Sequence, residues 1–227
     1  MKIRISANMD IYMATSHQLN TSFLLNKVGV SRETCEKLKC YYHLLIDWNK
    51  KINLVSRKSI DSSWVRHFLD SAQLWLYAPK ETRSWLDFGS GAGFPGMIIS
   101  IIAQELNPEL KVTLVEKNRK KVVFLKEVAR KLSVKAGIFC SRVEEIENQS
   151  ADVISSRAFG SLKVLLEIAY MHKNKRTTNL FPIGKKNNYS KEIIESKECW
   201  NFDIREIKNL IEPDSSILKI RNIEFAQ

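Results

Sequence analysis

The chain has 227 residues, of which 44% are hydrophobic, so it is long enough to bury a core and to form one domain, or one domain with an appendage. Its 36 lysines and arginines outnumber its 25 acidic residues, and the net charge of +11 favours a polyanionic partner such as nucleic acid. This composition excludes a short peptide, a fibre and a disordered basic tail, and no apolar run reaches the roughly 20 residues that cross a bilayer.

The sequence indicates neither a secretory signal nor a metal site. The first residues lack the apolar stretch of a signal peptide, so we expect a cytoplasmic protein in which residues 1–16 form a flexible extension. The cysteines at positions 35, 40, 140 and 199 lack the paired spacing of a zinc site, and we expect no metal. We expect these thiols to be reduced and to serve packing, with Cys140 buried.

The elements expected first in the chain are helical. Apolar and aromatic residues recur there at spacings of three and four, as in Leu38, Tyr41, Tyr42 and Leu45. Ser31 is expected to cap the helix that carries them, and a second helix is expected to start within residues 59–63 and to end near residue 79. We therefore expect residues 17–78 to form a helical appendage.

From residue 79 the pattern changes to short β-rich runs that alternate with amphipathic stretches, which is typical of βαβ units and a parallel sheet. Two later segments show strict alternation and are joined by a Pro213-Asp214 turn, which predicts a terminal antiparallel hairpin. Residues 79–227 are thus expected to form an α/β domain with a seven-stranded sheet. The expected strands are residues 85–88, 111–115, 136–140, 152–155, 179–183, 202–207 and 217–223, with helices at about 96–106, 118–132 and 161–172.

The most informative segment is a glycine-rich turn between an expected strand and an apolar helix: Asp87-Phe88-Gly89-Ser90-Gly91-Ala92-Gly93-Phe94-Pro95-Gly96. Alternating glycines let the backbone turn sharply and let a ligand lie against it, and Pro95 suits the first turn of a helix. Glycine-rich corners also occur for purely structural reasons, but five glycine or proline positions within residues 89–96 exceed that need. We expect this turn to hold a cofactor.

Two cofactors compete for the turn. Gly91, Gly93 and Gly96 satisfy the dinucleotide pattern, and Glu116 follows at about the 20-residue distance of a ribose-binding acid. Asp87 instead favours S-adenosylmethionine, because a carboxylate near the ligand is unfavourable beside a pyrophosphate and favourable beside an ammonium and a sulfonium. S-adenosylmethionine is therefore preferred over NAD, with the carboxylate of Glu116 accepting from both ribose hydroxyls.

Later strand ends carry further candidate residues. In the segment Ser141-Arg142-Val143-Glu144-Glu145, the backbone of Val143 and Glu144 is placed to pair with an adenine edge. Arg157 follows the fourth expected strand, at the sheet edge where open α/β folds bind ligands. Lys117 and Arg119 begin a helix whose basic face is either a solvated surface or a set of phosphate contacts.

In these motifs the chain resembles the bacterial 16S ribosomal RNA guanine nitrogen-7 methyltransferases, the glucose-inhibited division protein B family. The resemblance covers most of the chain and includes the segments 48–54 (WNKKINL), 66–71 (RHFLDS), 87–96, 141–145 and 156–159. It implies a Rossmann-like class I methyltransferase sheet, S-adenosylmethionine as methyl donor and a guanine in the decoding-region loop of 16S rRNA as acceptor. Because nitrogen-7 of guanine carries a lone pair and no proton, the reaction needs positioning rather than a general base.

The resemblance also implies site residues. It implies cofactor contacts at Gly89, Phe94, Val143, Glu144 and Arg157, to which the residues themselves add Asp87, Gly91, Gly93 and Glu116. Arg157 is expected to orient the guanine or a phosphate, and the candidate RNA contacts are Lys117, Arg119, Arg142 and Lys185. The family carries Leu-Lys-Gly on the fifth strand, whereas Ile183 stands here in place of the lysine. We expect the protein to be a monomer. Two other functions remain as alternatives to the methyltransferase: an NAD-dependent oxidoreductase, and a basic RNA-binding protein with a vestigial cofactor pocket.

Overall fold

The computed structural model describes residues 22–56, 60, 62–157, 159–184 and 189–226. The expected extension at residues 1–16 and the candidate RNA contact Lys185 lie outside these ranges. Within them, no helix combines the length and the apolar character needed to span a membrane.

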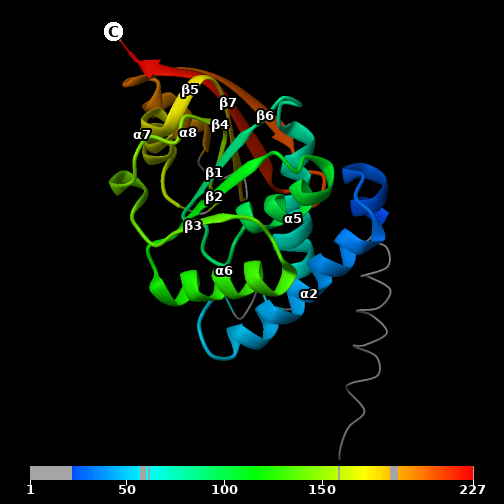
Figure 1. Cartoon of the computed structure of the whole chain (residues 1–227). Helices are drawn as coiled ribbons and strands as arrows, with labels where there is room; N and C mark the ends of the chain where they lie inside the picture. Colours follow the sequence, from blue (N-terminus) through cyan, green and yellow to red (C-terminus); the bar gives the residue numbers. More distant parts are fainter. Residues whose placement is uncertain (1–21, 57–59, 61, 158, 185–188, 227) are drawn as a thin grey trace, which may run out of the picture.

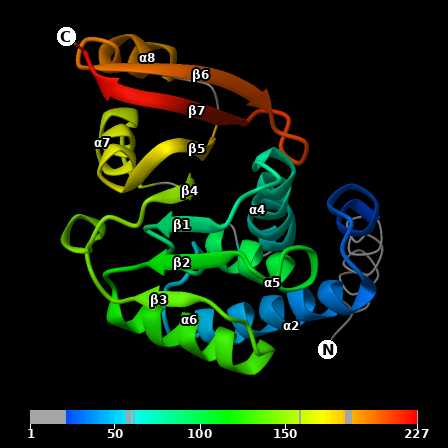
Figure 2. The ribbon, with the colours of Figure 1, turned by 45° about the horizontal axis from the view of Figure 1, so that its top comes forward.

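A seven-stranded sheet runs through the protein in the order β3-β2-β1-β4-β5-β7-β6, and Figure 2 shows the strands stacked in that order. The first five strands pair in parallel, whereas β7 pairs antiparallel with both β5 and β6. The expected α/β class, with five parallel strands and a terminal hairpin, is confirmed. The strands are β1 (Ser84–Phe88), β2 (Lys111–Val115), β3 (Gly137–Phe139), β4 (Ala151–Ser155), β5 (Lys173–Ile183), β6 (Trp200–Lys208) and β7 (Ser216–Phe225).

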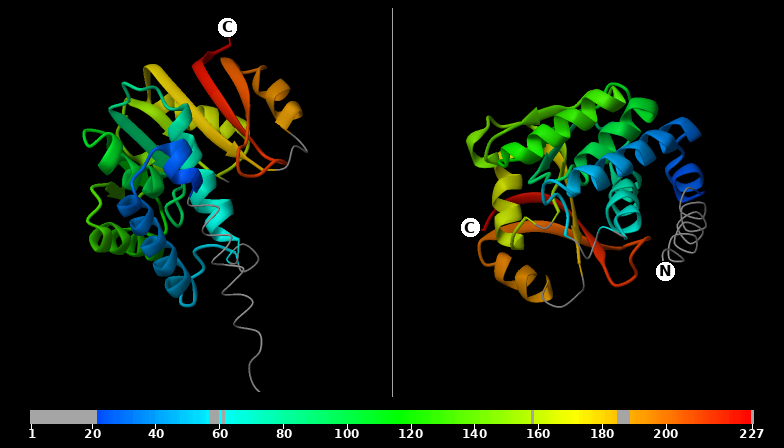
Figure 3. Two further views of the ribbon diagram at one scale, coloured as in Figure 1. Left: turned by 90° about the vertical axis from the view of Figure 1, so that its right-hand side faces the viewer. Right: turned by 90° about the horizontal axis from the view of Figure 1, so that it is seen from below.

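The helices of the amino-terminal segment, together with α5 and α6, pack against one face of the sheet (Figures 1 and 3). Side chains from all of them meet in one hydrophobic cluster, so the described helices between Leu24 and Leu74 share a core with the strands and helices that follow. Burying this apolar surface stabilises both parts at once. The elements of this layer are η1 (Leu24–Val28), α2 (Arg32–Asn49), η2 (Trp64–Leu69), α4 (Asp70–Ala72), η3 (Gln73–Tyr77), α5 (Gly96–Leu106) and α6 (Arg119–Leu132).

The opposite face is covered by α7 (Leu162–His172), which packs with the hairpin strands in a second hydrophobic cluster. The helix α8 (Tyr189–Ser196) lies beside α7 and is not among the expected helices. Its apolar pattern is weak, because Ile194 is 67% exposed and Ser196 is its buried residue. The short helical turn η4 (Val143–Glu145) follows β3.

Side-chain caps fix where two helices begin. The backbone N–H of Thr34 donates to Ser31 Oγ at 3.3 Å, so the expected cap of α2 is confirmed. Glu105 of α5 accepts from the Ser31 amide at 2.9 Å, which joins the start of α2 to α5. In α6, Asn118 Oδ1 accepts from the amides of Lys120 and Lys121 at 3.0 and 3.3 Å, so the helix starts directly after the end of β2.

Strand β5 begins earlier than expected, at Lys173. Ala151 of β4 pairs with Lys173, whereas Val153 pairs with Thr178, so the strand contains a bulge between these positions. The hydroxyl of Thr177 holds the bulge by donating to the carbonyl of Ala151 at 2.7 Å. The sequence did not reveal this part of the strand, because residues 173–176 are polar and lack apolar alternation.

The prediction that Cys140 is buried is wrong. Cys140 is exposed, because β3 is an edge strand that ends at Phe139, a residue that is itself 43% exposed. Cys40 and Cys199 are exposed as well, and Cys35 is buried in the cluster around α2. The expected packing role therefore applies to Cys35, whereas the other three cysteines are exposed.

Candidate functional site

The glycine turn after β1 uses backbone conformations and close contacts that exclude larger residues. Gly89, Gly91 and Gly93 have φ angles of +64°, +57° and +97°, a region that L-residues rarely adopt. A Cβ on Gly89 would lie 2.2 Å from the ring of Phe159, and one on Gly93 would lie 2.3 Å from Tyr41 Oη. At Gly91 the nearest atoms are at ordinary contact distance, 3.7 Å or more, so this backbone stays open.

Helix α2 holds the turn from behind. Tyr41 is fully buried, and its hydroxyl donates to the carbonyl of Ala92. The ring of Phe94 stacks on Tyr41 and on His67, with ring centroids 5.8 and 5.1 Å apart. Phe94 is therefore packed among the amino-terminal helices. The helical spacing of Tyr41 predicted a core residue. The same spacing could not reveal that its hydroxyl bonds to the carbonyl of Ala92, 51 positions away.

A cavity of about 300 Å³ lies at the carboxyl ends of the central parallel strands. It brings together four expected cofactor residues, Gly89, Glu116, Val143 and Glu144, and two candidate RNA contacts, Lys117 and Arg142. Lys121, Ser141 and Phe159 also line it and were not expected. A signal for Lys121 existed, since it lies four positions after Lys117 at the start of a helix.

Glu116 connects the glycine turn to the end of β2. Its Oε2 accepts from the amide of Gly91 at 2.9 Å, and its Oε1 accepts from the amide of Asn118 at 2.7 Å. The residue is 7% exposed, and its carboxylate lines the cavity. Because each carboxylate oxygen accepts at two lone-pair positions, both oxygens retain capacity for hydroxyl groups of a ligand.

Asp87 lies beneath the turn and does not line the cavity. It is fully buried, and Ser155 Oγ donates to its Oδ1 at 2.8 Å. Its Oδ2 is a buried atom that has no hydrogen-bond partner among the described residues. Gly96 gives the carboxyl its space, since a Cβ there would lie 2.6 Å from Asp87 Cβ. Burial raises the pKa of Asp87 to about 7, although the hydrogen bond from Ser155 acts in the opposite direction.

We expect Asp87→Asn to change how stability depends on pH. The unfolded carboxyl loses its proton near pH 4, whereas the folded one keeps it until about pH 7. The wild type should therefore lose stability relative to the variant as pH rises from about 4 to 7, with no further change above that range. Urea unfolding at several pH values measures the difference. Asp203→Asn, at an exposed position, is the control, and equal slopes for wild type and Asp87→Asn would contradict the prediction.

Arg157, at the end of β4, is clamped by two residues of the 66–71 segment. Its Nη1 donates to His67 Nδ1 at 2.8 Å, and its Nη2 lies 3.4 Å from Asp70 Oδ2. Burial and the charge of Arg157 lower the pKa of His67 to about 3, so the imidazole is neutral and accepts at Nδ1. The structure thus joins two motifs that lie 90 positions apart in the chain, and Arg157 is not among the residues that line the cavity.

Asp70 extends this clamp to the turn between β6 and β7. Its Oδ1 accepts from Gln73 Nε2 at 2.9 Å and from Asn209 Nδ2 at 2.6 Å, and all three side chains are buried. Arg66 forms an ion pair with Glu212 of the same turn at 3.2 Å. Sequence reasoning missed Asp70, Gln73 and Asn209. For Asp70 and Gln73 the signal was their spacing, because polar residues three positions apart lie on one face of a helix.

The remaining candidates lie at the rim of the cavity or outside it. Arg119 is exposed at the start of α6, and exposed Arg142 lies 3.7 Å from Glu145. Ile183 is 5% exposed and belongs to the second hydrophobic cluster, so the strand position that carries the family's lysine contributes to the core here.

Comparison with known proteins gives consistent matches. The family model GidB, described as rRNA small subunit methyltransferase G, matches residues 34–217. The ribosomal RNA small subunit methyltransferase G of Ruegeria sp. (strain TM1040) is 42% identical over 198 residues, which cover 87% of this chain and 95% of that relative. The protein of the same name from Rhodospirillum centenum is 38% identical over 195 residues, which cover 86% of this chain and 87% of that relative.

The fold is also similar to solved structures. A SAM dependent methyltransferase from Aquifex aeolicus matches with a TM-score of 0.54 at 16% identity, over 70% of this chain and 91% of that one. Ribosomal protein L11 methylase from Lactobacillus delbrueckii subsp. bulgaricus matches with a TM-score of 0.52 at 14% identity, over 68% and 77%. At these identities the likeness concerns the fold alone, and it confirms the expected Rossmann-like sheet.

Proposed function

Because the chain belongs to the GidB family of ribosomal RNA small subunit methyltransferases, we propose that it transfers the methyl group of S-adenosylmethionine to nitrogen-7 of a guanine in the decoding-region loop of 16S rRNA. The observation that carries this proposal is the cavity in which Glu116 is bonded to the glycine turn beside Val143 and Glu144. The net charge of +11 supports an RNA substrate. Family membership sets the NAD-dependent oxidoreductase aside.

The cavity residues fit S-adenosylmethionine. A volume of about 300 Å³ falls at the lower end of ordinary small-molecule sites, and Gly89 of the glycine turn lines the cavity, where the absence of a side chain permits close approach of a ligand. Glu116 would accept from the ribose hydroxyls, and the backbone of Val143 and Glu144 would pair with the adenine edge. When bound, the cofactor supplies an electrophilic methyl group on a sulfonium.

The chain's own contribution to the reaction is positioning. Guanine nitrogen-7 needs no base to remove a proton, so the residues have to hold it in line with the methyl group at about 3 to 3.5 Å. Arg157, fixed by His67 and Asp70, is suited to orient the guanine or its phosphate. Lys117, Arg119 and Arg142, all exposed, would hold neighbouring phosphates. We further propose that the helices within the expected segment 17–78, of which residues 17–21 lie outside the described part of the chain, shape the RNA groove.

Glu116→Gln is expected to weaken the binding of S-adenosylmethionine about 10- to 100-fold. In glutamine an NH₂ group, which donates, takes the place of one of the two carboxylate oxygens that accept from the Gly91 and Asn118 amides. Calorimetric titration of the cofactor measures the loss. Glu109→Gln, at an exposed position outside the cavity, should bind as the wild type does. Wild-type affinity in Glu116→Gln would show that the carboxylate is not part of the cofactor site.

The proposed function is tested by transfer of labelled methyl from S-adenosylmethionine to 16S rRNA, supplied naked and within the small ribosomal subunit. We expect one 7-methylguanosine in the decoding-region loop, made by a monomeric enzyme in the cytoplasm. Cofactor binding without transfer to either form would refute the substrate assignment. RNA binding without cofactor binding would favour the basic RNA-binding protein with a vestigial pocket.

A further inference from the structure

Three basic side chains lie together on one face of the β6–β7 hairpin, at the end of the sheet away from β3 (Figure 2). Arg205 of β6 is directly opposite Lys219 of β7 in the strand register, and Arg221 lies two positions further along β7. Directly opposed residues on an antiparallel pair have Cβ atoms about 4.5 to 5.5 Å apart, so their side chains are neighbours. These three residues, here called the basic hairpin face, line a hollow of about 260 Å³ together with Asp203 and Ile204.

The basic hairpin face belongs to the side of the sheet that carries the amino-terminal helices. Side chains alternate along a strand, and Ile217, two positions before Lys219, packs in the hydrophobic cluster of those helices. Leu218 and Ile220 point the other way and pack in the cluster around α7. The ammonium of Lys219 donates to the carbonyl of Tyr77, at the end of η3, at 2.8 Å. The basic hairpin face therefore begins where this helical layer ends.

The charges of this face are not neutralised within the part of the chain that the structure describes. The guanidinium of exposed Arg205 forms neither a hydrogen bond nor an ion pair with any residue there. Arg221 Nε donates to Thr178 Oγ1 at 2.9 Å, and its two terminal nitrogens have no partner among the same residues. Asp203 is the acidic residue of the lining, and its Oδ2 accepts from Asn222 Nδ2 at 2.6 Å. Three cations against one carboxylate leave an excess of positive charge.

This arrangement disfavours the folded protein in the absence of a ligand, because like charges directly opposite each other destabilise a pair of strands. Burial, together with the charges of Arg221 and Arg205, lowers the pKa of the Lys219 ammonium. Charged side chains on an edge strand protect a sheet from pairing with another chain, which accounts for a cation on β6. Lys219 and Arg221, however, lie on β7, which pairs with β5 on one side and with β6 on the other. An anionic ligand accounts for all three cations.

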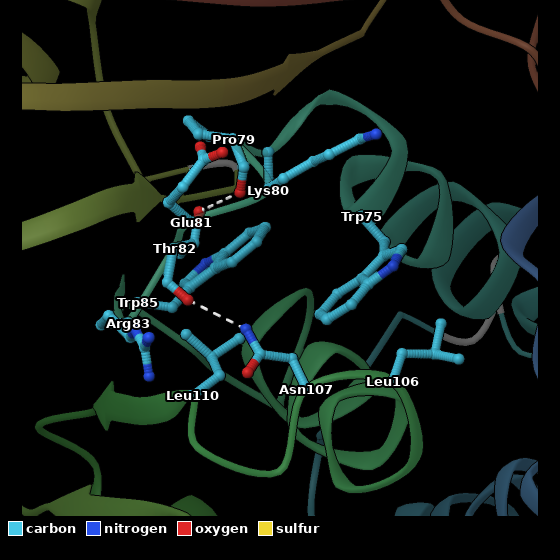
Figure 4. A pocket seen from close by; sticks show the side chains of 11 residues that line it. Trp75, Pro79, Lys80, Glu81, Thr82, Arg83, Trp85, Leu106, Asn107 and Leu110 are labelled. Carbon is cyan, nitrogen blue, oxygen red and sulfur yellow. Dashed lines mark hydrogen bonds between the residues drawn. The ribbon is translucent and has the colours of Figure 1, made fainter.

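The larger cavity of about 560 Å³ at the amino ends of β1 and β2 lacks this convergence of charge. Its lining includes Lys80 and Arg83, and Figure 4 shows these side chains pointing to opposite sides, so one anion does not reach both. On the hairpin the strand register places the cations next to one another. Phosphate matches such a group, because arginine and lysine donate charge-assisted hydrogen bonds to its oxygens.

We propose that the basic hairpin face binds the phosphate backbone of the RNA substrate. Arg205, Lys219 and Arg221 donate to phosphate oxygens of one stretch of the RNA, and binding removes the repulsion among the three cations. The inference rests on the proposed function, since 16S rRNA supplies the phosphates. Backbone contacts fix the position of a nucleic acid and do not read its sequence. The face therefore contributes affinity, whereas the candidate site selects the guanine.

The test measures the affinity of labelled 16S rRNA for the wild type, Arg205→Gln and Lys219→Gln. We expect each variant to bind about 3- to 10-fold more weakly at about 50 mM salt. The loss of affinity between about 50 and about 200 mM salt should shrink by about 3-fold, the share of one phosphate contact. Arg205→Lys retains the charge and should bind nearly as the wild type does. Lys197→Gln removes one charge at an exposed position after α8 and is the matched control, with wild-type binding expected.

Urea unfolding and cofactor titration separate this role from a structural one. Arg205→Gln should be as stable as the wild type or more stable, because it removes a like-charge contact, and its affinity for S-adenosylmethionine should be unchanged. Lower stability or cofactor affinity that accounts for the loss of RNA binding overturns the proposal.

The RNA measurements themselves decide the rest. Wild-type RNA affinity and salt dependence in both glutamine variants, or an equal loss in Lys197→Gln, overturn the proposal. A calorimetric titration with inorganic phosphate distinguishes the other source of the anion: phosphate binding that both variants lose, with RNA affinity intact, assigns the face to free phosphate and overturns the RNA contact. A wild type that binds 16S rRNA through this face without methylating it refutes the proposed function alone. A wild type that binds no RNA refutes both.

Discussion

Replacing Arg157 with alanine is expected to lower methyl transfer to 16S rRNA by about 100-fold or more, the cost of displacing a reacting group by about 1 Å. The guanidinium is the donor to His67 and the cation beside Asp70, and both of these groups are buried or partly buried. Removing it leaves the Asp70 carboxylate without its positive partner and releases the end of β4 from the 66–71 segment. Single-turnover transfer of labelled methyl measures the effect.

The matched control for this prediction is Arg66→Ala. Arg66 belongs to the same segment, but its side chain is 48% exposed and pairs with Glu212 at the surface, so its loss should change the rate little. Asp70→Asn tests the positioning role separately. It retains the shape and removes the charge, and we expect a lower maximal rate with the cofactor affinity unchanged. A wild-type rate in Arg157→Ala would remove Arg157 from the proposed mechanism.

Gly93→Ala is expected to destabilise the fold by about 2 to 6 kcal/mol, the sum of about 1 to 3 kcal/mol for a strained backbone and about 1 to 3 kcal/mol for overpacking. Gly93 has a φ of +97°, and its added methyl group would lie 2.3 Å from Tyr41 Oη and 2.9 Å from Leu125 Cδ2. Domains are stable by about 5 to 15 kcal/mol, so this single methyl group removes a large share.

Urea unfolding compares Gly93→Ala with Gly29→Ala, which isolates the backbone contribution. Gly29 also has a positive φ, +85°, but no atom lies within 4 Å of its added Cβ. The Gly29 variant should therefore lose about 1 to 2 kcal/mol, as expected for the left-handed conformation alone. Equal losses of unfolding free energy in the two variants would contradict the prediction, because they would show that Tyr41 and Leu125 move aside for the methyl group without destabilising the fold.

Sequence reasoning succeeded where local patterns decide the structure. The bounds of β2 and α5 are those predicted, because apolar runs there end at glycine, proline or charged residues. The position of Glu116 directly after a strand was predictable for the same reason, and the structure places its carboxylate in the cavity lining, bonded to the glycine turn. The prediction that Cys140 is buried was wrong because the residue directly follows an edge strand, and a strand's place at the edge depends on strand order, which no local pattern states.

The parts of the site that the sequence did not reveal depend on contacts between distant residues. Tyr41 bonds to a carbonyl 51 positions away, and Asp70 bonds to Asn209 139 positions away. The contacts of Asp87 could not be predicted from the sequence either. A central parallel strand is buried on both faces, so its apolar pattern does not show which atoms a side chain contacts.

The shared core of the amino-terminal helices and α6 has a consequence for synthesis on the ribosome. Tyr41 of α2 packs against Phe124 of α6, with ring centroids 6.1 Å apart. The 83 residues that separate them take roughly 4 to 17 s to translate at about 5 to 20 residues per second. During that interval the apolar face of α2 lacks its partner, and such transiently exposed apolar surface is prone to aggregation until α6 has been made.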